Sequence, residues 1–390
     1  MNNPTPLEAP IDAAVSHRKL SIGLPRCVSS SEQRFPLTPE AVASLVGRGY
    51  NVVMEQDAAR HIHYPDTAYI NAGAKIVARR ETLEADIVIH LAPLPLADIS
   101  CLRKGALLLS LANFARENGA DVIRRLLDRK VINIAIDLIA DDKGHFPFAD
   151  ILSEIDGRAA MVLASSMMAD PTNGKGILLG GIAGVIPCEV IILGSNLAAC
   201  AAAKSAIGLG ATVRMFDDNV YRLRRALRRL GDGVIGSSIH SNALENAIHS
   251  ADVVIATSFR SRVVIDAEGE KIMKKSVLVF DLSDAPGKAF PAMKLVDLGQ
   301  EEPHSPLEGR HYCHHNVGSA VPRTAAMALS DTFITMLDDI AGCEAYSSAI
   351  QLTGNLQRAT LTFLGKAVSR KVAEIAGVRH TDINLLLSLS

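Results

Sequence analysis

The sequence predicts an α/β protein of two domains, each built on a mostly parallel sheet. Its 390 residues are more than one ordinary hydrophobic core organises. Apolar runs of strand length alternate with helical stretches along the chain, which is the pattern of parallel sheets. Residues 190–217 read as strand, tight turn, helix and strand, VIILGSNLAACAAAKSAIGLGATVRMFD. That is the order of a dinucleotide-binding βαβ unit.

Composition excludes several classes of protein. The hydrophobic fraction of 48% and charged fraction of 21% are those of a globular chain, and the net charge of −2 gives no basic excess for nucleic acid or an anionic membrane. No segment approaches the roughly 20 apolar residues that span a bilayer, and the N-terminus lacks a signal-peptide core. Six cysteines without C-x-x-C pairs indicate free thiols. We therefore expect a cytoplasmic protein with no membrane or nucleic-acid partner.

The first domain is expected over residues 20–147, after a flexible arm at residues 1–19. Thr38 can cap a helix over residues 41–48, with Pro39 in its first turn and Gly49 after its end. The apolar runs predict strands at residues 20–24, 51–55, 85–91, 106–111 and 131–138.

The second domain is expected over residues 148–323, with a helix over residues 150–168 bridging the two domains. Strands are predicted at residues 190–193, 212–216, 253–256 and 276–282. The arginine-rich run at residues 221–230 has apolar residues at helical spacing, so it predicts an amphipathic helix with a solvated basic face. A loop at residues 316–322 precedes a long helix, and residues 324–390 are expected to return to the first domain.

The turn after the strand at residues 190–193 keeps only the first glycine of G-x-G-x-x-G. Gly194, Ser195, Asn196 and Leu197 are the candidates to contact a dinucleotide, since the pyrophosphate needs backbone N–H groups at a helix N-terminus. Asn196 replaces the second glycine and Ala199 the third. Asparagine adopts positive φ more readily than most residues, so we expect Asn196 to fit the turn, although its side chain takes space that glycine leaves to phosphate.

Asp217 is the candidate to bind the ribose. It lies 23 residues after Gly194, close to the usual spacing of about 20 residues. An acid at this position favours NAD over NADP, and Arg222 could soften that preference. The alternative is a Rossmann-like domain that serves folding and assembly and binds no nucleotide.

Other side chains have two interpretations each. Arg34 lies in a loop where it could clamp a carboxylate with two hydrogen bonds, or it is a solvated surface arginine. Asp284 follows the carboxyl end of a strand, where it could orient substrate or relay a proton, or it belongs to an ordinary turn. His90 is a general base or a core histidine. His314 and His315 are adjacent on a strand and face opposite ways, so we expect no metal site.

Taken together, several segments resemble the family of alanine dehydrogenase and the transhydrogenase α-subunit. The resemblance extends over nearly all of residues 20–390. The segments that carry it are RFPLTP (34–39), YINAGA (69–74), LSEIDGR (152–158), NGKGILLGGIAGV (173–185), IGLGAT (207–212), NVGSAVPRT (316–324) and DINLL (382–386).

The resemblance implies a fold and an activity. The fold would have two Rossmann-like domains, with a central NAD-binding domain inserted in a discontinuous substrate domain. The activity would be the reversible oxidative deamination of L-alanine to pyruvate and ammonia, with hydride passing to NAD. The resemblance also implies a homo-oligomer, either a hexamer or a dimer.

Residue roles follow from the same resemblance. Arg34 matches the arginine that holds the substrate carboxylate, and Asp284 matches the active-site aspartate. Ser153 matches a serine that contacts the cofactor, and Asp217 matches the acid that binds the ribose. Asn316 falls in the loop that lines the nicotinamide pocket.

The chain departs from the family at two catalytic positions. The family's Lys-x-Lys-Glu-Pro segment is matched by HLAP at residues 90–93, with His90 at the first lysine and Ala92 at the second. The family's histidine aligns with Asn113 or its neighbour, and asparagine cannot shuttle a proton near neutral pH. Two alternatives therefore stay open. One is a catalytically impaired member that acts as a dinucleotide-binding or assembly protein; the other is a dehydrogenase for another 2-amino acid, with His90 as its base.

Overall fold

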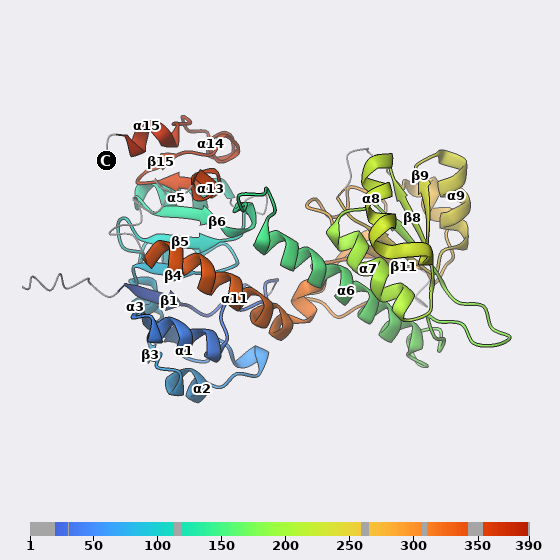
Figure 1. Ribbon diagram of the computed structural model, residues 1–390, viewed down its shortest axis with the longest axis horizontal. Coiled ribbons are helices and arrows are strands. Elements are labelled where there is room, and N and C mark those ends of the chain that lie inside the picture. The colour runs from blue at the N-terminus through green and yellow to red at the C-terminus, as the bar shows by residue number, and fades with distance from the viewer. Residues whose placement is uncertain are drawn as a thin grey trace, which may run out of the picture.

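The chain folds into two lobes joined by a long helix, α6 (Pro147–Ala169), as Figure 1 shows. The computed structural model describes residues 20–29, 31–112, 119–258, 265–305, 310–341 and 354–388. The expected arm at residues 1–19 and the candidate residue Asn113 lie outside the described residues. In the part of the chain that is described, no helix is long and apolar enough to cross a membrane.

One lobe, which we call the outer lobe, consists of the elements before α6 together with those from α11 (Pro322–Ala341) to the C-terminus. It contains an eight-stranded sheet in the order β15-β14-β6-β5-β4-β1-β2-β3. Strands β1 to β6 pair in parallel, whereas β14 pairs antiparallel with β6 and with β15. The C-terminal segment thus extends the sheet that the N-terminal segment begins. The strands are β1 (Ser21–Leu24), β2 (Asn51–Glu55), β3 (Lys75–Val77), β4 (Ile87–Ile89), β5 (Leu107–Ser110), β6 (Ile132–Ala135), β14 (Thr360–Phe363) and β15 (Lys366–Ala367).

Helices cover both faces of this sheet. The Thr38 hydroxyl accepts a hydrogen bond from Ala41 N at 3.3 Å and caps α1, as its position before Pro39 predicts. The helices are α1 (Pro39–Gly47), α2 (Asp66–Asn71), α3 (Arg79–Leu83), α4 (Leu96–Ile99), α5 (Gly119–Asp128), α11 (Pro322–Ala341), α13 (Gly354–Ala359), α14 (Arg370–Ala376) and α15 (Ile383–Leu387), with 3₁₀ turns η1 (Arg60–Ile62) and η2 (Ile136–Leu138).

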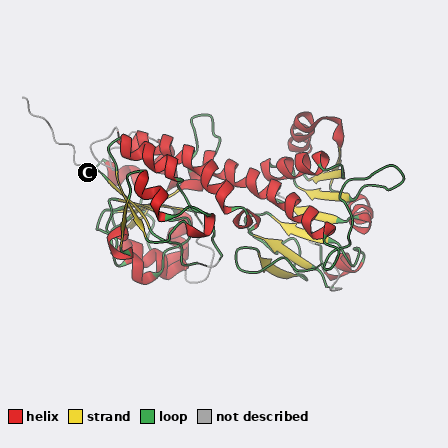
Figure 2. Cartoon of the chain, turned by 90° about the horizontal axis from the view of Figure 1, so that it is seen from below, coloured by secondary structure: helices red, strands yellow, loops and turns green. Residues whose placement is uncertain are grey.

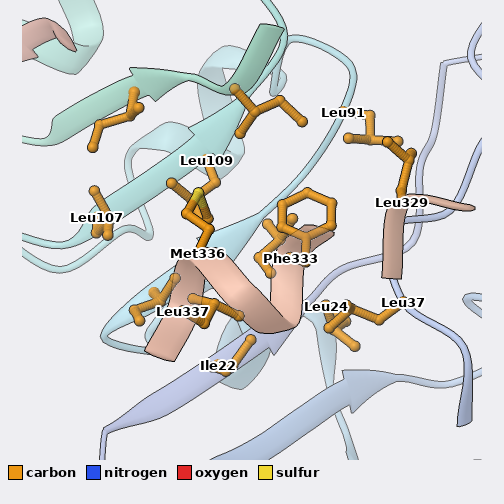
Figure 3. Packing of buried hydrophobic residues seen from close by; sticks show 14 of the residues in the cluster. Ile22, Leu24, Leu37, Leu91, Leu107, Leu109, Leu329, Phe333, Met336 and Leu337 are labelled. Atoms are coloured by element: carbon orange, nitrogen blue, oxygen red, sulfur yellow. The ribbon is translucent and has the colours of Figure 1, made fainter. Parts of the chain in front are cut away.

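The core of the outer lobe lies between α11 and the sheet. Figure 3 shows Phe333 and Leu337 of α11 directed at the strands, among Ile22 of β1 and Leu109 of β5. All four side chains are at most 1% exposed, so the packing removes them from water. It fixes α11 on one face of the sheet.

The other lobe is formed by the middle of the sequence, from β7 to η4, and we call it the central lobe. It contains a seven-stranded parallel sheet in the order β12-β13-β11-β10-β7-β8-β9. Figure 2 shows this sheet between helices at the end of the molecule opposite the C-terminus. The strands are β7 (Glu189–Leu193), β8 (Thr212–Asp217), β9 (Val234–Ser238), β10 (Val253–Ala256), β11 (Leu278–Asp281), β12 (Lys294–Asp297) and β13 (Tyr312–His315). The other elements are α7 (Leu197–Gly208), α8 (Val220–Leu230), α9 (Ser241–Ser250), α10 (Ala267–Lys271), η3 (Gly231–Gly233) and η4 (Val317–Ala320).

The strand order reverses beside β7. The chain continues from β7 to β8 on one side and later to β10 on the other, so the carboxyl end of β7 is a topological switch point, where open α/β sheets bind their ligands. The predicted fold class is confirmed: the protein is α/β, with two parallel-sheet domains.

Helix α6 packs tightly on α7. A Cβ atom added at Gly157 would lie 2.2 Å from the Ala198 carbonyl oxygen, so only glycine permits this approach. Alanine side chains at Ala201 and Ala202 of α7 complete the contact. The helix begins at Pro147, three residues before the predicted start, because proline is well suited to the first helical turn.

Candidate functional site

The turn after β7 has the backbone of a dinucleotide-binding turn. Gly194 has φ of +105°, and a Cβ atom there would lie 2.1 Å from the Thr257 hydroxyl oxygen. Glycine is therefore required both by the backbone conformation and by the space. The turn lies at the switch point beside β7 and leads into the N-terminus of α7, which Leu197 opens.

Asn196 fits this turn in a different way from the one expected. Its φ of −74° and ψ of −172° are extended, so no positive φ is used. Extended backbone is usual for an N-cap residue, and the Asn196 Oδ1 atom accepts a hydrogen bond from Ala199 N at 3.0 Å. One N–H group at the helix N-terminus is thereby bound within the protein.

Asp217 is buried at the carboxyl end of β8, with 0% exposure. Its Oδ2 atom accepts a hydrogen bond from the Ser195 hydroxyl at 2.5 Å. Its Oδ1 atom accepts from Asn219 N at 2.7 Å and from Arg222 Nη2 at 2.9 Å. Burial alone would raise the pKa of Asp217, but these hydrogen bonds outweigh burial and lower it, so the carboxylate stays charged.

The turn and Asp217 lie at the carboxyl ends of the adjacent strands β7 and β8, and the Ser195 hydroxyl joins them through its hydrogen bond to Asp217. Arg222, which also binds Asp218 at 2.8 Å, brings a positive charge to the same place. Sequence analysis placed all of these residues in one site, and the structure brings them together.

A second set of residues lies where the two lobes meet. Arg34, in the loop after β1, binds the Glu32 carboxylate through both Nε at 2.8 Å and Nη2 at 2.6 Å. The two side chains are only 11% and 7% exposed. Among the described residues, Arg34 Nη1 has no hydrogen-bond partner. Although burial opposes the charge, the nearby carboxylates of Glu32, Asp156 and Asp137 raise the pKa of Arg34.

Two half-buried aspartates accompany Arg34. Asp137 lies in η2 and accepts a hydrogen bond from Ala112 N at 2.8 Å, while Asp156 lies on α6. Burial raises the pKa of both carboxyl groups, and the positive charge of Arg34 opposes that rise. The site thus combines one guanidinium with carboxyl groups from the loop, from η2 and from α6.

Asp284 approaches this set from the central lobe. It is exposed beyond the carboxyl end of β11 and accepts a hydrogen bond from the Ser258 hydroxyl at 3.2 Å. Its negative charge helps to raise the pKa of Asp137, so the two groups are within electrostatic reach. Asp137 is the group on which both act: the Asp284 carboxylate raises its pKa and the Arg34 guanidinium lowers it.

Asn316 joins the two lobes. It adopts the left-handed conformation with φ of 57°. Its side-chain amide donates to Asp297 Oδ1 at 2.8 Å and to the Ser31 carbonyl of the outer lobe, and accepts from the Ser319 hydroxyl at 2.9 Å. Ser153 is half-buried on α6, one turn before Asp156.

A hollow lies beside η4 and the start of α11. Its volume is about 450 Å³, and it is lined by Gln33 and His61 of the outer lobe and by residues 319–324. Gln33, next to Arg34 in sequence, also donates to the Gly299 carbonyl of the central lobe at 3.2 Å. Solvent-accessible space therefore borders the loop that carries Arg34.

His90 is 2% exposed directly after β4. Its Nδ1 atom is 2.6 Å from the Ala92 carbonyl oxygen, and Nε2 has no hydrogen-bond partner within the described part of the chain. Burial lowers the pKa of His90, which keeps the ring neutral near pH 7. The structure brings His90 into no hydrogen bond with Arg34 or Asp284, and its role in proton transfer stays a prediction.

The histidine-rich strand β13 is buried in its middle, at Cys313 and His314. His314 is buried and His315 half-buried. In the described ranges, no group of three or more His, Cys, Asp or Glu side chains is placed to hold a metal ion.

Sequence reasoning missed Glu32, Asp137 and Asp156. A signal was present for Asp137, since it falls at the end of the predicted strand 131–138, where parallel sheets place functional groups. The observed strand ends at Ala135 and turns into η2, which directs the chain across the end of the sheet. For Asp156 no such sequence signal exists, because its nearness to the Arg34 charge depends on the tertiary fold.

Comparisons with known proteins place the chain in a family. The model of the alanine dehydrogenase/PNT N-terminal domain matches residues 23–155, and that of the C-terminal domain matches residues 160–370. The chain is 29% identical over 371 residues to an alanine dehydrogenase of Staphylococcus haemolyticus, covering 93% of this chain and 98% of that protein. It is 28% identical over 380 residues to alanine dehydrogenase 2 of Staphylococcus aureus, covering 95% and 100%.

Solved structures show the same likeness. An L-alanine dehydrogenase superposes with a TM-score of 0.79 at 25% identity, covering 91% of this chain and 99% of that one. A transhydrogenase from Sinorhizobium meliloti superposes with a TM-score of 0.73 at 20% identity, covering 90% and 99%, which supports the fold.

Proposed function

Because the chain belongs to the alanine dehydrogenase/PNT family, we propose that it is an NAD-dependent oxidoreductase of the alanine dehydrogenase type. The reaction is the reversible oxidative deamination of L-alanine to pyruvate and ammonia. The observation that carries the proposal is the Arg34–Glu32 ion pair where the two lobes meet, with side chains only 11% and 7% exposed and with the Asp137 and Asp156 carboxylates nearby. A guanidinium in that position binds and orients a small carboxylic acid.

Arg34 binds the substrate carboxylate through Nη1. Glu32 holds the opposite edge of the guanidinium and thereby fixes its orientation. The loop 31–34 also contacts the central lobe through Ser31 and Gln33, so substrate binding is coupled to the junction.

The carboxyl groups handle the amine and its protons. Asp284 lies on the central-lobe side and Asp137 on the outer-lobe side, and burial raises the pKa of Asp137 toward the range in which a carboxylate accepts and returns protons. NAD supplies the acceptor for the hydride from the substrate α-carbon. The residues proposed to hold NAD are Gly194, Ser195, Asn196, Leu197, Asp217, Arg222, Ser153 and Asn316.

His90 is the second candidate for proton transfer. Its neutral ring with an unpaired Nε2 atom is chemically able to accept a proton, and it occupies the position of a family lysine in the sequence match. Access to substrate requires the surrounding loop to move, because the side chain is buried. The second candidate function is therefore that of a dehydrogenase for another 2-amino acid, with His90 as its base.

We also propose that the protein is a homo-oligomer in the cytoplasm. The segment 177–186 presents a run of apolar side chains to solvent: Ile177, Leu178, Ile182, Val185 and Ile186, the last of them 90% exposed. Exposed apolar groups of this size are typical of subunit contacts. The described cysteines, Cys27, Cys101, Cys188, Cys200 and Cys313, are free thiols, as in a reducing compartment.

The proposal is tested by assaying NADH formation with L-alanine and with a panel of 2-amino acids. Turnover with L-alanine supports alanine dehydrogenase activity, and turnover with another member of the panel supports the second candidate. Folded protein without turnover at high enzyme concentration would contradict both. Titration with NADH, monitored by calorimetry, then separates a dinucleotide-binding protein from a purely structural one.

A further inference from the structure

In the dinucleotide site proposed above, groups that would bind the ligand are already hydrogen-bonded to other groups of the chain. Two side chains of its own turn already bind two of the groups that a dinucleotide would contact. The Ser195 hydroxyl binds the Asp217 carboxylate at 2.5 Å, and the Asn196 side chain binds the Ala199 amide at 3.0 Å. Asn196 stands where G-x-G-x-x-G has its second glycine, and Ser195 stands in the position just before it.

The Ser195 hydrogen bond closes access to Asp217. Ser195 is 8% exposed and Asp217 is 0% exposed, so a ribose hydroxyl has no open face of the carboxylate to approach. Asn219 N and Arg222 Nη2 occupy the other oxygen atom. A ribose can therefore reach Asp217 only if the Ser195 hydroxyl leaves it. Hydrogen bonds to a charged group are among the stronger ones, so this exchange lowers affinity.

The Asn196 hydrogen bond has the same effect at the helix N-terminus. Backbone N–H groups of the first turn are the donors that a pyrophosphate uses. Asn196 satisfies the Ala199 N–H from within the chain, and its side chain occupies space that glycine would leave empty. The extended backbone at Asn196 shows that glycine is not needed here for its conformational freedom, so replacement by glycine is compatible with the observed turn.

We propose that Ser195 and Asn196 form an intramolecular gate that lowers the affinity of this chain for the dinucleotide, and that the site binds it only after both side chains turn away. The gate rests on the proposed function only for the identity of the ligand. It differs from loss of the site, because Gly194 and its close contact with Thr257 are retained and the turn keeps the required backbone.

The test measures NADH binding by isothermal titration calorimetry, without any assay of turnover. The variants are Ser195→Gly, Asn196→Gly and the double variant, with thermal denaturation to show that each is folded. Asn196→Gly alone leaves every hydrogen bond of Asp217 in place, so it remains informative if the Ser195 variants are unstable. Ser195→Thr keeps a hydroxyl at the gate. Asp382→Gly, which removes the N-cap of α15 in the outer lobe, is the matched control for loss of a helix cap.

We expect the double variant to bind NADH at least about tenfold more tightly than the unmodified protein, with each single glycine variant in between. Ser195→Thr is expected to keep the low affinity and Asp382→Gly to leave it unchanged. Unchanged or weaker binding by the folded glycine variants overturns the gate, and so does the absence of measurable binding in all of them. Failure of the proposed function is a separate result, because it appears as absent turnover whatever the affinity.

Discussion

Glu32 and Arg34 form a bidentate ion pair between side chains only two residues apart, at 2.8 and 2.6 Å. The Arg34 backbone N–H also donates to Glu32 Oε1 at 2.9 Å, so the loop closes on itself around one carboxylate. A buried ion pair gives little net stability, but it fixes geometry. Here it fixes the direction in which the remaining guanidinium nitrogen meets a ligand.

Replacement of Arg34 by lysine tests this arrangement. An ammonium group is a point charge and cannot bind Glu32 and a substrate carboxylate in the same planar geometry. We expect Arg34→Lys to raise KM for pyruvate and L-alanine by roughly tenfold to a hundredfold, the effect of losing a hydrogen bond between charged groups. Steady-state kinetics measure this.

The control for Arg34 is Arg158→Lys. Arg158 also binds a carboxylate, Glu154, but the pair is exposed on α6 and worth little. It is expected to leave KM unchanged. An Arg34→Lys protein with normal KM would show that Arg34 does not bind the substrate.

The contact between α6 and α7 makes a stability prediction. Gly157→Ala places a methyl group 2.2 Å from the Ala198 carbonyl oxygen, so the helices must separate. We expect a loss of about 1–3 kcal/mol in the free energy of unfolding. Chemical denaturation measures it.

Gly47→Ala is the matched substitution in α1. Nothing lies within 4 Å of a Cβ atom there, so the higher helix propensity of alanine should dominate and stabilise by up to about 1 kcal/mol. Equal effects of the two substitutions would contradict the close packing of α6 on α7.

Burial of His314 gives a pH dependence of stability. The His314 ring donates through Nδ1 to the Val279 carbonyl at 3.1 Å and accepts at Nε2 from His304 N at 3.2 Å, which suits the neutral ring only. Burial is the main cause that lowers the pKa of His314 from 6.5 to about 4.

Between pH 6.5 and about 4, the unfolded chain therefore binds a proton that the folded chain does not. The free energy of unfolding falls as the pH falls through this window, by up to roughly 3 kcal/mol from this residue. Urea denaturation at several pH values should show a smaller slope for His314→Gln, which cannot titrate. An identical slope would mean that His314 does not contribute.

His90 gives a prediction about catalysis. If its Nε2 atom takes part in proton transfer, His90→Ala lowers kcat by about a hundredfold or more and removes one ionisation from the pH profile. His145→Ala is the control, because His145 is exposed and paired with Asp141. Full activity of the His90→Ala protein would exclude the role and leave the protons to Asp137 and Asp284.

The order of elements was predictable because it depends on local patterns. Apolar runs and glycines placed β7, α7 and β8, and Thr38 with Pro39 placed the start of α1. The strand predicted at residues 131–138 is shorter, because the chain turns at Ala135 into η2. Periodicity did not detect that change, since Ile136 and Leu138 on either side of Asp137 keep the alternation of a strand.

The site was predictable only in part. Asp217 and Gly194 were found because their spacing in sequence is regular in βαβ units. The pairing of Arg34 with Glu32 and the approach of Asp156 depend on tertiary packing of α6 against the loop after β1. The N-cap role of Asn196 was missed because a turn residue was judged by its φ preference and not by its side-chain acceptor.

Transfer of hydride from the α-carbon of an amino acid is the central claim, and a label transfer tests it most directly. The protein is incubated at stoichiometric concentration with NAD and L-alanine deuterated at the α-carbon, and the reduced cofactor is analysed by mass spectrometry. The account predicts deuterium in the NADH formed. No labelled NADH after prolonged incubation, with protein that is folded and binds NADH, would contradict it.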